Sequence, residues 1–445
     1  MKNKWIKLTT AGFGIFAFIL AGSSSCNIDK QTDLNFPSVD GIETNASISE
    51  LNNVITGMLA GMRNSFDTYN DDVSIIGRDY YRFTSADPRF VQDLPGTQES
   101  TIDNNTFYTV NPWTNFYRVI RNGWVVRHAI ANTSAPLTDE QKNGYLGVAK
   151  TIQALEFIYI SNMTYDNGIR FEVEDPDNLG PLTTSWQESL SDIAGLLDEA
   201  NNDLMNAGDE FVLQLSSGFA GFDTPASFAT FNRALKARID LYRTNYSDAL
   251  ADLNTSFYNL NGDLNTGCYI AYSTGSGDFA NNLFVPLPNT PADARVAQNL
   301  WVQQADTDDL RLSKVVFDSA TIVQGELSSN YAVNIWTSQN APVSIIRNEE
   351  LLLIAAEAYN ETANSASAVE CINKIREAAG LTDYAGPTDV ASLRDEIVTQ
   401  RRYSLFGEGH RWVDMRRLNR LDQIQTDNPD EDVWLEFPIP ASEPQ

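Results

Sequence analysis

Histidine and cysteine are scarce in this chain: its 445 residues include two histidines and three cysteines. Neither His128 nor His410 has a second histidine or a cysteine at the spacing that a zinc site requires. The sequence also lacks a GxSxG nucleophile elbow, a phosphate-binding P-loop and a dinucleotide fingerprint. We therefore predict that the protein has no metal centre and no cofactor, and that it is not an enzyme.

Basic residues are also few. Lys and Arg number 31 against 59 Asp and Glu, which gives a formal net charge of −28. Because such a surface repels the phosphates of nucleic acid, we predict no nucleic-acid partner. The charge suits a soluble domain that is secreted or faces the periplasm. With so many carboxylates, two will face each other by chance. An acidic hydrolase, which needs such a pair about 5–9 Å apart, therefore stays open as an alternative.

Long apolar runs are missing, apart from one near the N-terminus. Residues 11–21 are apolar and follow three lysines, as in an export signal, but they are fewer than the roughly 20 residues needed to span a bilayer. The segment ends in Gly22-Ser-Ser-Ser-Cys26, and small residues before a cysteine are what lipoprotein signal peptidase accepts. We predict a lipoprotein signal peptide over residues 1–25 and a lipid-anchored N-terminus at Cys26.

Two points about these cysteines stay open. Ser23 stands where leucine is commoner before a lipidated cysteine, so an ordinary secreted protein cut nearby is the alternative. Cys268 and Cys371 are predicted to be buried thiols, with a disulfide between them as the second possibility. Residues 26–46 are polar and are interpreted as a tether, followed by a single domain over residues 47–445.

Helical periodicity is what the sequence does have. Apolar residues recur at steps of three and four, with small residues where two helices can approach closely. The helical segments are 47–66, 113–131, 141–163, 185–204, 228–259 and 347–380. Pairs of this kind cannot bury their apolar faces alone and stack on similar pairs. We predict a mainly α fold, a tetratricopeptide-like superhelix, with an irregular loop-rich lobe at about 260–345 that holds a few short strands.

Residues 68–112 lack this periodicity and are rich in aromatic side chains, and a long loop of this kind in a helical protein is often functional. A sugar ring stacks its C–H face on Trp or Tyr and offers its hydroxyls to polar groups. We predict that ligand is bound here and near Trp301. The alternative for each aromatic is that it anchors its loop to the helices. The candidates are Tyr80, Tyr81, Phe83, Phe90, Trp113, Trp301, Asp79, Arg82, Asp87 and Arg89.

The acidic segment Asp306-x-Asp308-Asp309 could hold a hard cation through oxygen ligands. It lacks the glycine and the final glutamate of an EF-hand loop. We predict a solvated acidic turn, with bound Ca²⁺ as the alternative.

Three motifs near the C-terminus, in this order, carry a resemblance to a known family. They are Arg347-x-x-Glu350-Leu-Leu-Leu-x-Ala-Ala-Glu357, Ile372-Asn373-x-Ile375-Arg376-x-Ala-Ala-Gly380, and Arg401-Arg402-x-x-Leu405-Phe-x-Glu408-Gly409-x-Arg411-Trp412-x-Asp414. Together they resemble the C-terminal half of the SusD/RagB family. Gln400 and Ser404 depart from the glutamates that the family often has there.

The resemblance implies a SusD-like fold and a nutrient-binding lipoprotein of the outer membrane that faces the cell surface. Such a protein binds an oligosaccharide or another small nutrient and delivers it to a SusC-like TonB-dependent transporter. A peptide-binding member of the family and a repeat scaffold for protein partners are the alternatives. We interpret the motif residues as structural, because a tight glycine turn, a buried tryptophan and paired charges serve a framework. They are Arg347, Glu350, Glu357, Glu408, Gly409, Arg411, Trp412 and Asp414.

Overall fold

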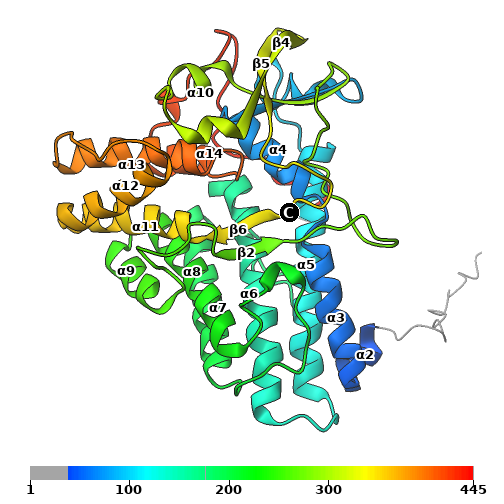
Figure 1. The fold of residues 1–445 in the computed structure, drawn as a ribbon. Helices are drawn as coiled ribbons and strands as arrows, with labels where there is room; N and C mark the ends of the chain where they lie inside the picture. Colours follow the sequence, from blue (N-terminus) through cyan, green and yellow to red (C-terminus); the bar gives the residue numbers. More distant parts are fainter. Residues whose placement is uncertain (1–38, 176, 444–445) are drawn as a thin grey trace, which may run out of the picture.

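The computed structural model describes residues 39–175 and 177–443. The predicted signal peptide, the lipidation site at Cys26 and the first part of the predicted tether lie outside the described residues. Figure 1 shows long helices in the lower half of the molecule, shorter helices on one side and a small sheet at the top. Within the described ranges, no helix combines the length and the apolarity that a membrane crossing requires.

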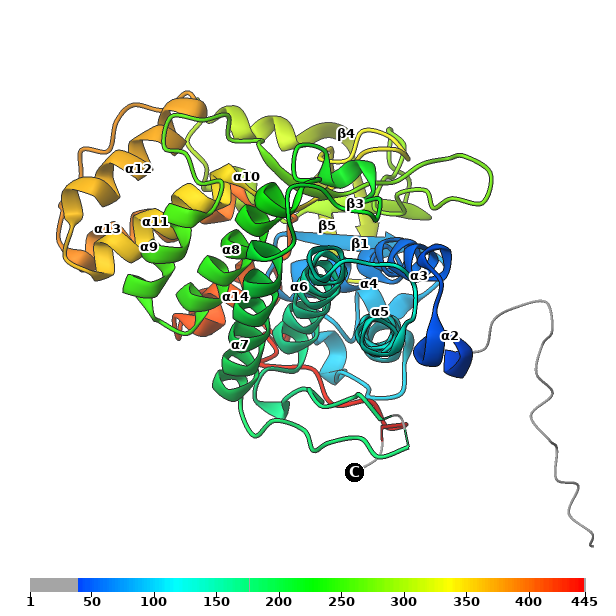
Figure 2. The same ribbon diagram turned by 90° about the horizontal axis from the view of Figure 1, so that it is seen from below.

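Among the described residues, α5 to α9 pack against one another in sequence order, and the three helices before them, α2, α3 and α4, pack against α5. Figure 2 shows α5 and α6 nearly end on, with α3 beside α5 and α7 beside α6. Local sequence explains where two of them begin, because Ser47 with Glu50 and Thr138 with Gln141 form capping boxes. The helices are α2 (Val39–Asn45), α3 (Ile48–Gly61), α4 (Phe66–Ile76), α5 (Phe107–Asn132), α6 (Asp139–Thr164), α7 (Trp186–Met205), α8 (Pro225–Tyr242) and α9 (Tyr246–Thr255).

The C-terminal helices continue this stacking. Helix α11 packs against α8 and α9 on one side and against α12 and α13 on the other, and nearly all its residues are buried. This is the arrangement of a helical superhelix, in which each pair covers the apolar face of the next. The bounds are α11 (Asn348–Glu361), α12 (Ser365–Ala378), α13 (Val390–Ser404) and α14 (Arg411–Arg417).

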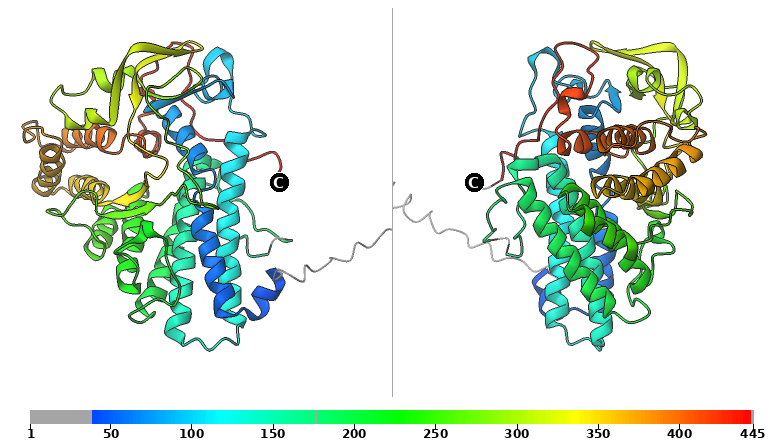
Figure 3. Two further views of the ribbon diagram at one scale, coloured as in Figure 1. Left: turned by 45° about the vertical axis from the view of Figure 1, so that its right-hand side comes forward. Right: turned by 90° about the vertical axis from the view of Figure 1, so that its left-hand side faces the viewer.

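Two small antiparallel sheets complete the fold. The four-stranded sheet has the order β1-β3-β5-β4, and the two-stranded sheet joins β2 to β6. Figure 3 shows that the β4–β5 hairpin projects beyond the helices. The strands are β1 (Tyr80–Thr84), β2 (Gly267–Ile270), β3 (Asp293–Ala297), β4 (Val315–Gln324), β5 (Leu327–Val333) and β6 (Val343–Arg347). The short helix α10 covers Asn299–Gln303, and 3-10 turns include η4 (Ser217–Phe219) and η6 (Leu421–Gln423).

The predicted tether ends earlier than residue 46. Helix α2 lies inside the tether range and packs against α5, where Glu43 forms an ion pair of 2.7 Å with Arg121. The Thr133 hydroxyl donates to the carbonyl oxygen of Ala46 at 2.5 Å. The polar composition of this segment suggested a tether without contacts. Its groups instead bond to α5 and to Thr133, which follows the end of α5.

The segment 68–112 was predicted to be non-helical, and this is wrong at both ends. Helix α4 runs to Ile76, and α5 begins at Phe107, ahead of Pro112. The apolar pattern is hidden in α4 because its polar residues are buried as well: Asn70 bonds to the Tyr80 hydroxyl and Asp71 pairs with Arg295. In the loop-rich lobe, strands form around Val315 and Tyr331, whereas the apolar residues 283–285 form no strand.

Candidate functional site

Four of the predicted ligand-binding aromatics are core residues. Tyr80, Tyr81, Phe83 and Trp301 each have 0% relative exposure. Three of them lie on β1, which is covered on both faces, and Trp301 packs at 4.2 Å, centroid to centroid, on Phe406. The prediction that these side chains stack on a ligand is therefore wrong in this structure. A short strand that is buried on both faces lacks the alternation of polar and apolar residues, so its sequence resembles that of an aromatic loop.

The other predicted site residues split into two groups. Trp113 is 8% exposed, and its indole N–H donates to Glu443 at 3.1 Å, so it holds the C-terminal segment against α5. The carboxylate of Asp79 is buried and accepts the backbone N–H of Gly407. The remaining residues stay partly exposed, and each charged one has a protein partner: Arg82 pairs with Asp293, Arg89 pairs with Asp87 and lies over the Phe107 ring, and Phe90 packs on the same ring.

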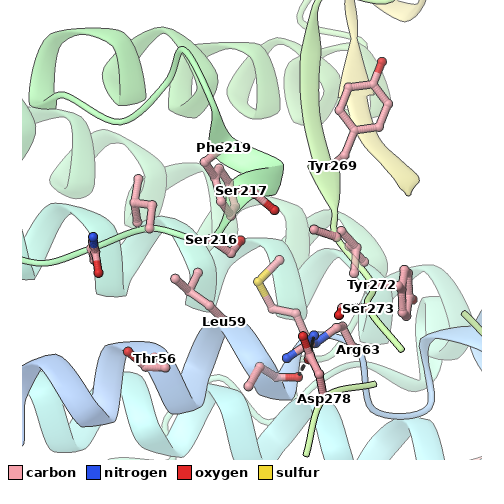
Figure 4. Close-up of a pocket in the computed structure, with 16 residues that line it drawn as sticks. Thr56, Leu59, Arg63, Ser216, Ser217, Phe219, Tyr269, Tyr272, Ser273 and Asp278 are labelled. Carbon is pink, nitrogen blue, oxygen red and sulfur yellow. Dashed lines mark hydrogen bonds and ion pairs between the residues drawn. The ribbon is translucent and has the colours of Figure 1, made fainter. Parts of the chain in front are cut away.

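A cavity of about 320 Å³ opens between α3, the η4 turn, and β2 with the loop that follows it. Figure 4 shows its apolar floor and its polar wall. Leu59, Met62 and Phe219 are buried and form the floor, because they belong to the inward faces of α3 and η4. Exposed Thr56, Gln214, Ser216 and Ser217 add hydroxyl and amide groups along the rim.

A charged pair closes one end of this cavity. Arg63, just after α3, forms an ion pair with Asp278 from the loop after β2. The guanidinium also lies over the Phe279 ring, 4.9 Å from its centroid, and Phe279 is 42% exposed. The backbone N–H of Phe279 and the Arg63 guanidinium hold the pKa of Asp278 below its usual range. At neutral pH the pair thus presents a carboxylate acceptor, guanidinium donors and an aromatic ring in one place.

The two tyrosines of this wall differ in role. Tyr272 is 9% exposed and its hydroxyl makes no hydrogen bond to any described residue, while burial raises its pKa, so it is a free neutral donor. The hydroxyl of Tyr269 donates to the carbonyl oxygen of Asn265 at 2.5 Å, and Figure 4 shows its ring directed away from Arg63.

The groups that line this cavity can bind a ligand that has both polar edges and apolar faces. Its lining contains one carboxylate, Asp278, and a glycosidase needs two, with the pKa of one of them raised. Donors and acceptors around an apolar floor match the edge hydroxyls and C–H faces of a sugar. Among the described residues, no cluster of three or more His, Cys, Asp or Glu side chains could hold a metal ion.

Sequence reasoning missed this cavity because its walls are distant in the chain. Arg63 and Asp278 are 215 residues apart, and only the packing of β2 beside α3 brings them together. One signal was present: Phe279 ends a Gly- and Ser-rich stretch, where a large aromatic has no local apolar partner.

Comparison with known proteins finds a family likeness in the C-terminal part of the chain. A model of the SusD family matches residues 318–434. SusD-like protein P38 of Formosa agariphila is 29% identical over 141 residues, which is 30% of this chain and 25% of that protein. SusD-like protein P2 of the same organism is 33% identical over 113 residues, 22% of each chain. The matched segment thus spans about a quarter of these relatives.

Residues 318–434 of the chain match the SusD family.

Solved structures extend the likeness, as one of fold, to most of the chain. A structure described as a laminarin binding SusD-like protein covers 88% of this chain and 95% of its own, with a TM-score of 0.64 at 17% identity. Surface glycan-binding protein A from Bacteroides thetaiotaomicron, in complex with laminarihexaose, covers 88% and 96% with a TM-score of 0.68 at 14% identity. At 14–17% identity, these structures show that the chain has a similar fold and nothing more.

The C-terminal motifs that resemble the SusD family build a buried ionic framework. Arg347 pairs with Glu408 at 2.7 Å, and Arg401 pairs with Asp414 at 2.6 Å. Glu350 accepts two hydrogen bonds from Arg238 on α8, and Glu357 accepts two from Arg417. These pairs tie α8, α11, α13 and α14 together.

Two further motif residues shape the turn before α14. Trp412 is fully buried, and its indole N–H donates to the carbonyl oxygen of Trp434 at 2.7 Å. Gly409 adopts a φ of +79°, which L-residues rarely occupy. The guanidinium of Arg411, which we interpreted as a framework residue, makes no hydrogen bond or ion pair to any described residue.

Two alternatives from the sequence are resolved. Asp309 forms a 2.7 Å ion pair with Arg311, so its carboxylate is not free to bind Ca²⁺ with Asp306 and Asp308. Cys268 and Cys371 are both buried free thiols, so the disulfide alternative is wrong.

Proposed function

We propose that the protein captures an oligosaccharide at the outer surface of the cell and delivers it, chemically unchanged, to a SusC-like TonB-dependent outer-membrane transporter. The observation that carries this proposal is the cavity between α3 and β2, with an apolar floor, a rim of hydroxyls and amides, and the Arg63–Asp278 pair at one end. The fold of a glycan-bound surface protein supports the same class of ligand.

Delivery requires binding that is reversible. A neutral hydrogen bond contributes about 0.5–1.5 kcal/mol net, and one to a charged group about 1.5–3 kcal/mol. A few such bonds and one stacked ring give dissociation constants of about 1 µM to 1 mM. This range allows capture from a dilute medium and release to a transporter.

The anchoring part of the proposal concerns the N-terminal residues. Residues 1–25 act as a lipoprotein signal peptide, Cys26 becomes the lipidated N-terminus, and the residues up to 38 tether one domain that begins at α2. The protein is then held at the outer membrane by its lipid alone. Cys26→Ser should release the protein from the membrane fraction, and unchanged membrane association would refute the anchor.

Ligand binding is tested with a glycan panel that includes laminarihexaose, followed by calorimetry. Arg63→Gln removes the guanidinium but keeps two amide donors, and should weaken binding of the selected glycan about tenfold. Arg121→Gln is a matched control, because Arg121 also forms an exposed ion pair, with Glu43, and lies outside the cavity. Equal affinities for wild type and Arg63→Gln would remove the cavity from the account.

The transporter partnership is tested by pull-down from outer membranes with the lipidated protein. The proposal predicts recovery of a large TonB-dependent barrel. A protein that stays unaccompanied in mild detergent would count against the partnership. Selection of peptides over every glycan would move the ligand class to the peptide alternative.

A further inference from the structure

A second cavity, of about 510 Å³, lies between α10, α13, α14 and η6. None of its lining residues belongs to the α3–β2 cavity. Three of its lining residues are arginines: Arg402, Arg411 and Arg420. In a chain with a formal net charge of −28, three guanidinium groups around one hollow are unexpected.

Arg411 has an unpaired guanidinium. This group makes no hydrogen bond or ion pair to any described residue. Burial, with the positive charge of Arg402, lowers its pKa to about 10. The acid nearest to compensating it, Asp79, already accepts the N–H of Gly407, and burial raises the pKa of Asp79 to about 7. A charge removed from water without a partner is costly, so Arg411 is a group prepared for an anion.

The partners of the other two arginines do not cancel the positive charge of the cavity. Arg402 donates to the amide oxygen of Gln304 at 2.6 Å, which leaves its charge uncompensated. Arg420 forms a 2.7 Å ion pair with Asp395, whose side chain is 66% exposed. Asp395 is the one carboxylate in the lining. Three positive charges against one negative charge leave an excess of two.

The cavity also has room and donors for more than a bare ion. Thr399 and Gln423 are exposed on its rim, and the Tyr403 hydroxyl, in the lining, makes no hydrogen bond to any described residue. A volume of about 510 Å³ lies within the range of small-molecule pockets, which is about 300–1,000 Å³. Guanidinium groups bind carboxylates and sulfates through paired, charge-assisted hydrogen bonds.

We propose that this arginine cavity binds an acidic sugar, with the carboxylate of a uronic acid or a sulfate ester held by Arg402 and Arg411 and the hydroxyls facing Gln423, Thr399 and Tyr403. Arg420 adds positive potential at the mouth. The proposal stands independently of the α3–β2 cavity, because no residue is shared.

The test is a ligand-observed NMR titration of the full mature chain with four probes: glucuronate, glucose 6-sulfate, inorganic sulfate and glucose. We expect both acidic sugars to bind, glucose to show no saturation, and inorganic sulfate to bind more weakly than either acidic sugar. Binding should weaken as ionic strength rises, because the cavity is open to solvent. Equal affinity for sulfate and the acidic sugars would overturn the assignment to a saccharide, and saturable glucose binding of equal affinity would overturn the role of the charge.

Variants identify the residues. Arg402→Gln, and separately Arg411→Lys, should each weaken binding of the acidic sugars about tenfold or more, because a charge-assisted or bidentate contact is lost. Arg394→Gln is the matched control: Arg394 lies on the same helix, α13, pairs with Glu361 and does not line the cavity. If Arg411→Lys fails to fold, Arg402→Gln with Arg420→Gln decides the matter. Unchanged affinity in those two variants, or an equal loss in Arg394→Gln, would refute the site.

A cross-test separates this proposal from the function proposed above. Arg63→Gln should leave binding of acidic sugars unchanged, and Arg402→Gln should leave binding of a neutral oligosaccharide at the α3–β2 cavity unchanged. Loss of both activities in either variant would show that one site serves both ligands and would overturn the second site.

Discussion

Removal of one carboxylate from the motif framework should lower the protein's free energy of unfolding by a large fraction. Glu350 lies on α11 and is 1% exposed. Its two oxygens accept hydrogen bonds from Arg238 on α8 at 2.7 and 2.6 Å, and Arg238 also donates to the carbonyl oxygen of Ile345. In Glu350→Gln the amide keeps the shape, but the buried Arg238 guanidinium loses its counter-charge.

The magnitude follows from what is left behind. Breaking a buried ion pair by removal of one partner costs about 3–5 kcal/mol. Removal of both charges together costs much less, because apolar side chains of similar volume often substitute without loss. We therefore expect Glu350→Gln to lower the free energy of unfolding by about 3–5 kcal/mol. The double variant Arg238→Met with Glu350→Leu should recover most of it.

The assay is equilibrium unfolding in urea, followed by far-UV circular dichroism for the wild type and both variants. A cost below about 1 kcal/mol for Glu350→Gln would refute the reasoning, since that is the range of exposed pairs. The pH adds a second check. Burial opposes ionisation of Glu350, but the charges of Arg238 and His410 lower its pKa below the ordinary value of 4.5. The pair's stabilisation should thus be complete above about pH 4.5 and be lost as the pH falls through the lowered value.

Three further predictions concern other parts of the fold. Burial raises the pKa of Asp79 from 3.8 to about 7. The stability that depends on protonated Asp79 is therefore fully present below pH 3.8 and is lost as the pH rises through about 7. Asp79→Asn should raise the free energy of unfolding at pH 8 by up to about 4 kcal/mol and flatten its dependence on pH, and an unchanged pH profile would refute the pKa shift. Gly168 has a φ of +78°, and an added Cβ would lie 2.1 Å from the carbonyl oxygen of Thr183, so Gly168→Ala should cost about 2–5 kcal/mol. One control is Gly221→Ala, which has a φ of +83° but open space around it and should lower the stability by about 1–2 kcal/mol. The other is Gly195→Ala within α7, which should raise the stability by about 1 kcal/mol. Equal effects at all three glycines would contradict this geometry. Because burial raises the pKa of both Cys268 and Cys371, a thiol reagent at pH 8 should modify them only in denaturant, and rapid labelling of the native protein would contradict their burial.

The sequence predicted the parts of the fold in which information is local. The segment 347–380 was predicted to be helical, and α11 and α12 lie there with Asn364 between them. Strong periodicity, small residues at the crossing and a capping residue all act within a few positions. The mainly α fold followed from several such segments.

The sequence failed where tertiary contacts decide. Helix α4 was missed because Asn70, Asp71 and Asp72 face the interior, which reverses the usual pattern of polar residues outside. The aromatics of β1 were expected at the ligand, but β3 and the surrounding helices cover them. Arg63 and Asp278 could not be paired from the sequence, since no periodicity links positions so far apart.

The most direct test of the central claim is a calorimetric titration of the glycan that the panel selects, run on the wild type, Arg63→Gln and Arg121→Gln, with the sugar analysed afterwards by chromatography. We expect one saturable site with a dissociation constant of about 1 µM to 1 mM. It also predicts binding about tenfold weaker in Arg63→Gln alone, and a sugar recovered intact. Binding unaffected by Arg63→Gln, or a sugar recovered as shorter products, would contradict reversible capture at the α3–β2 cavity.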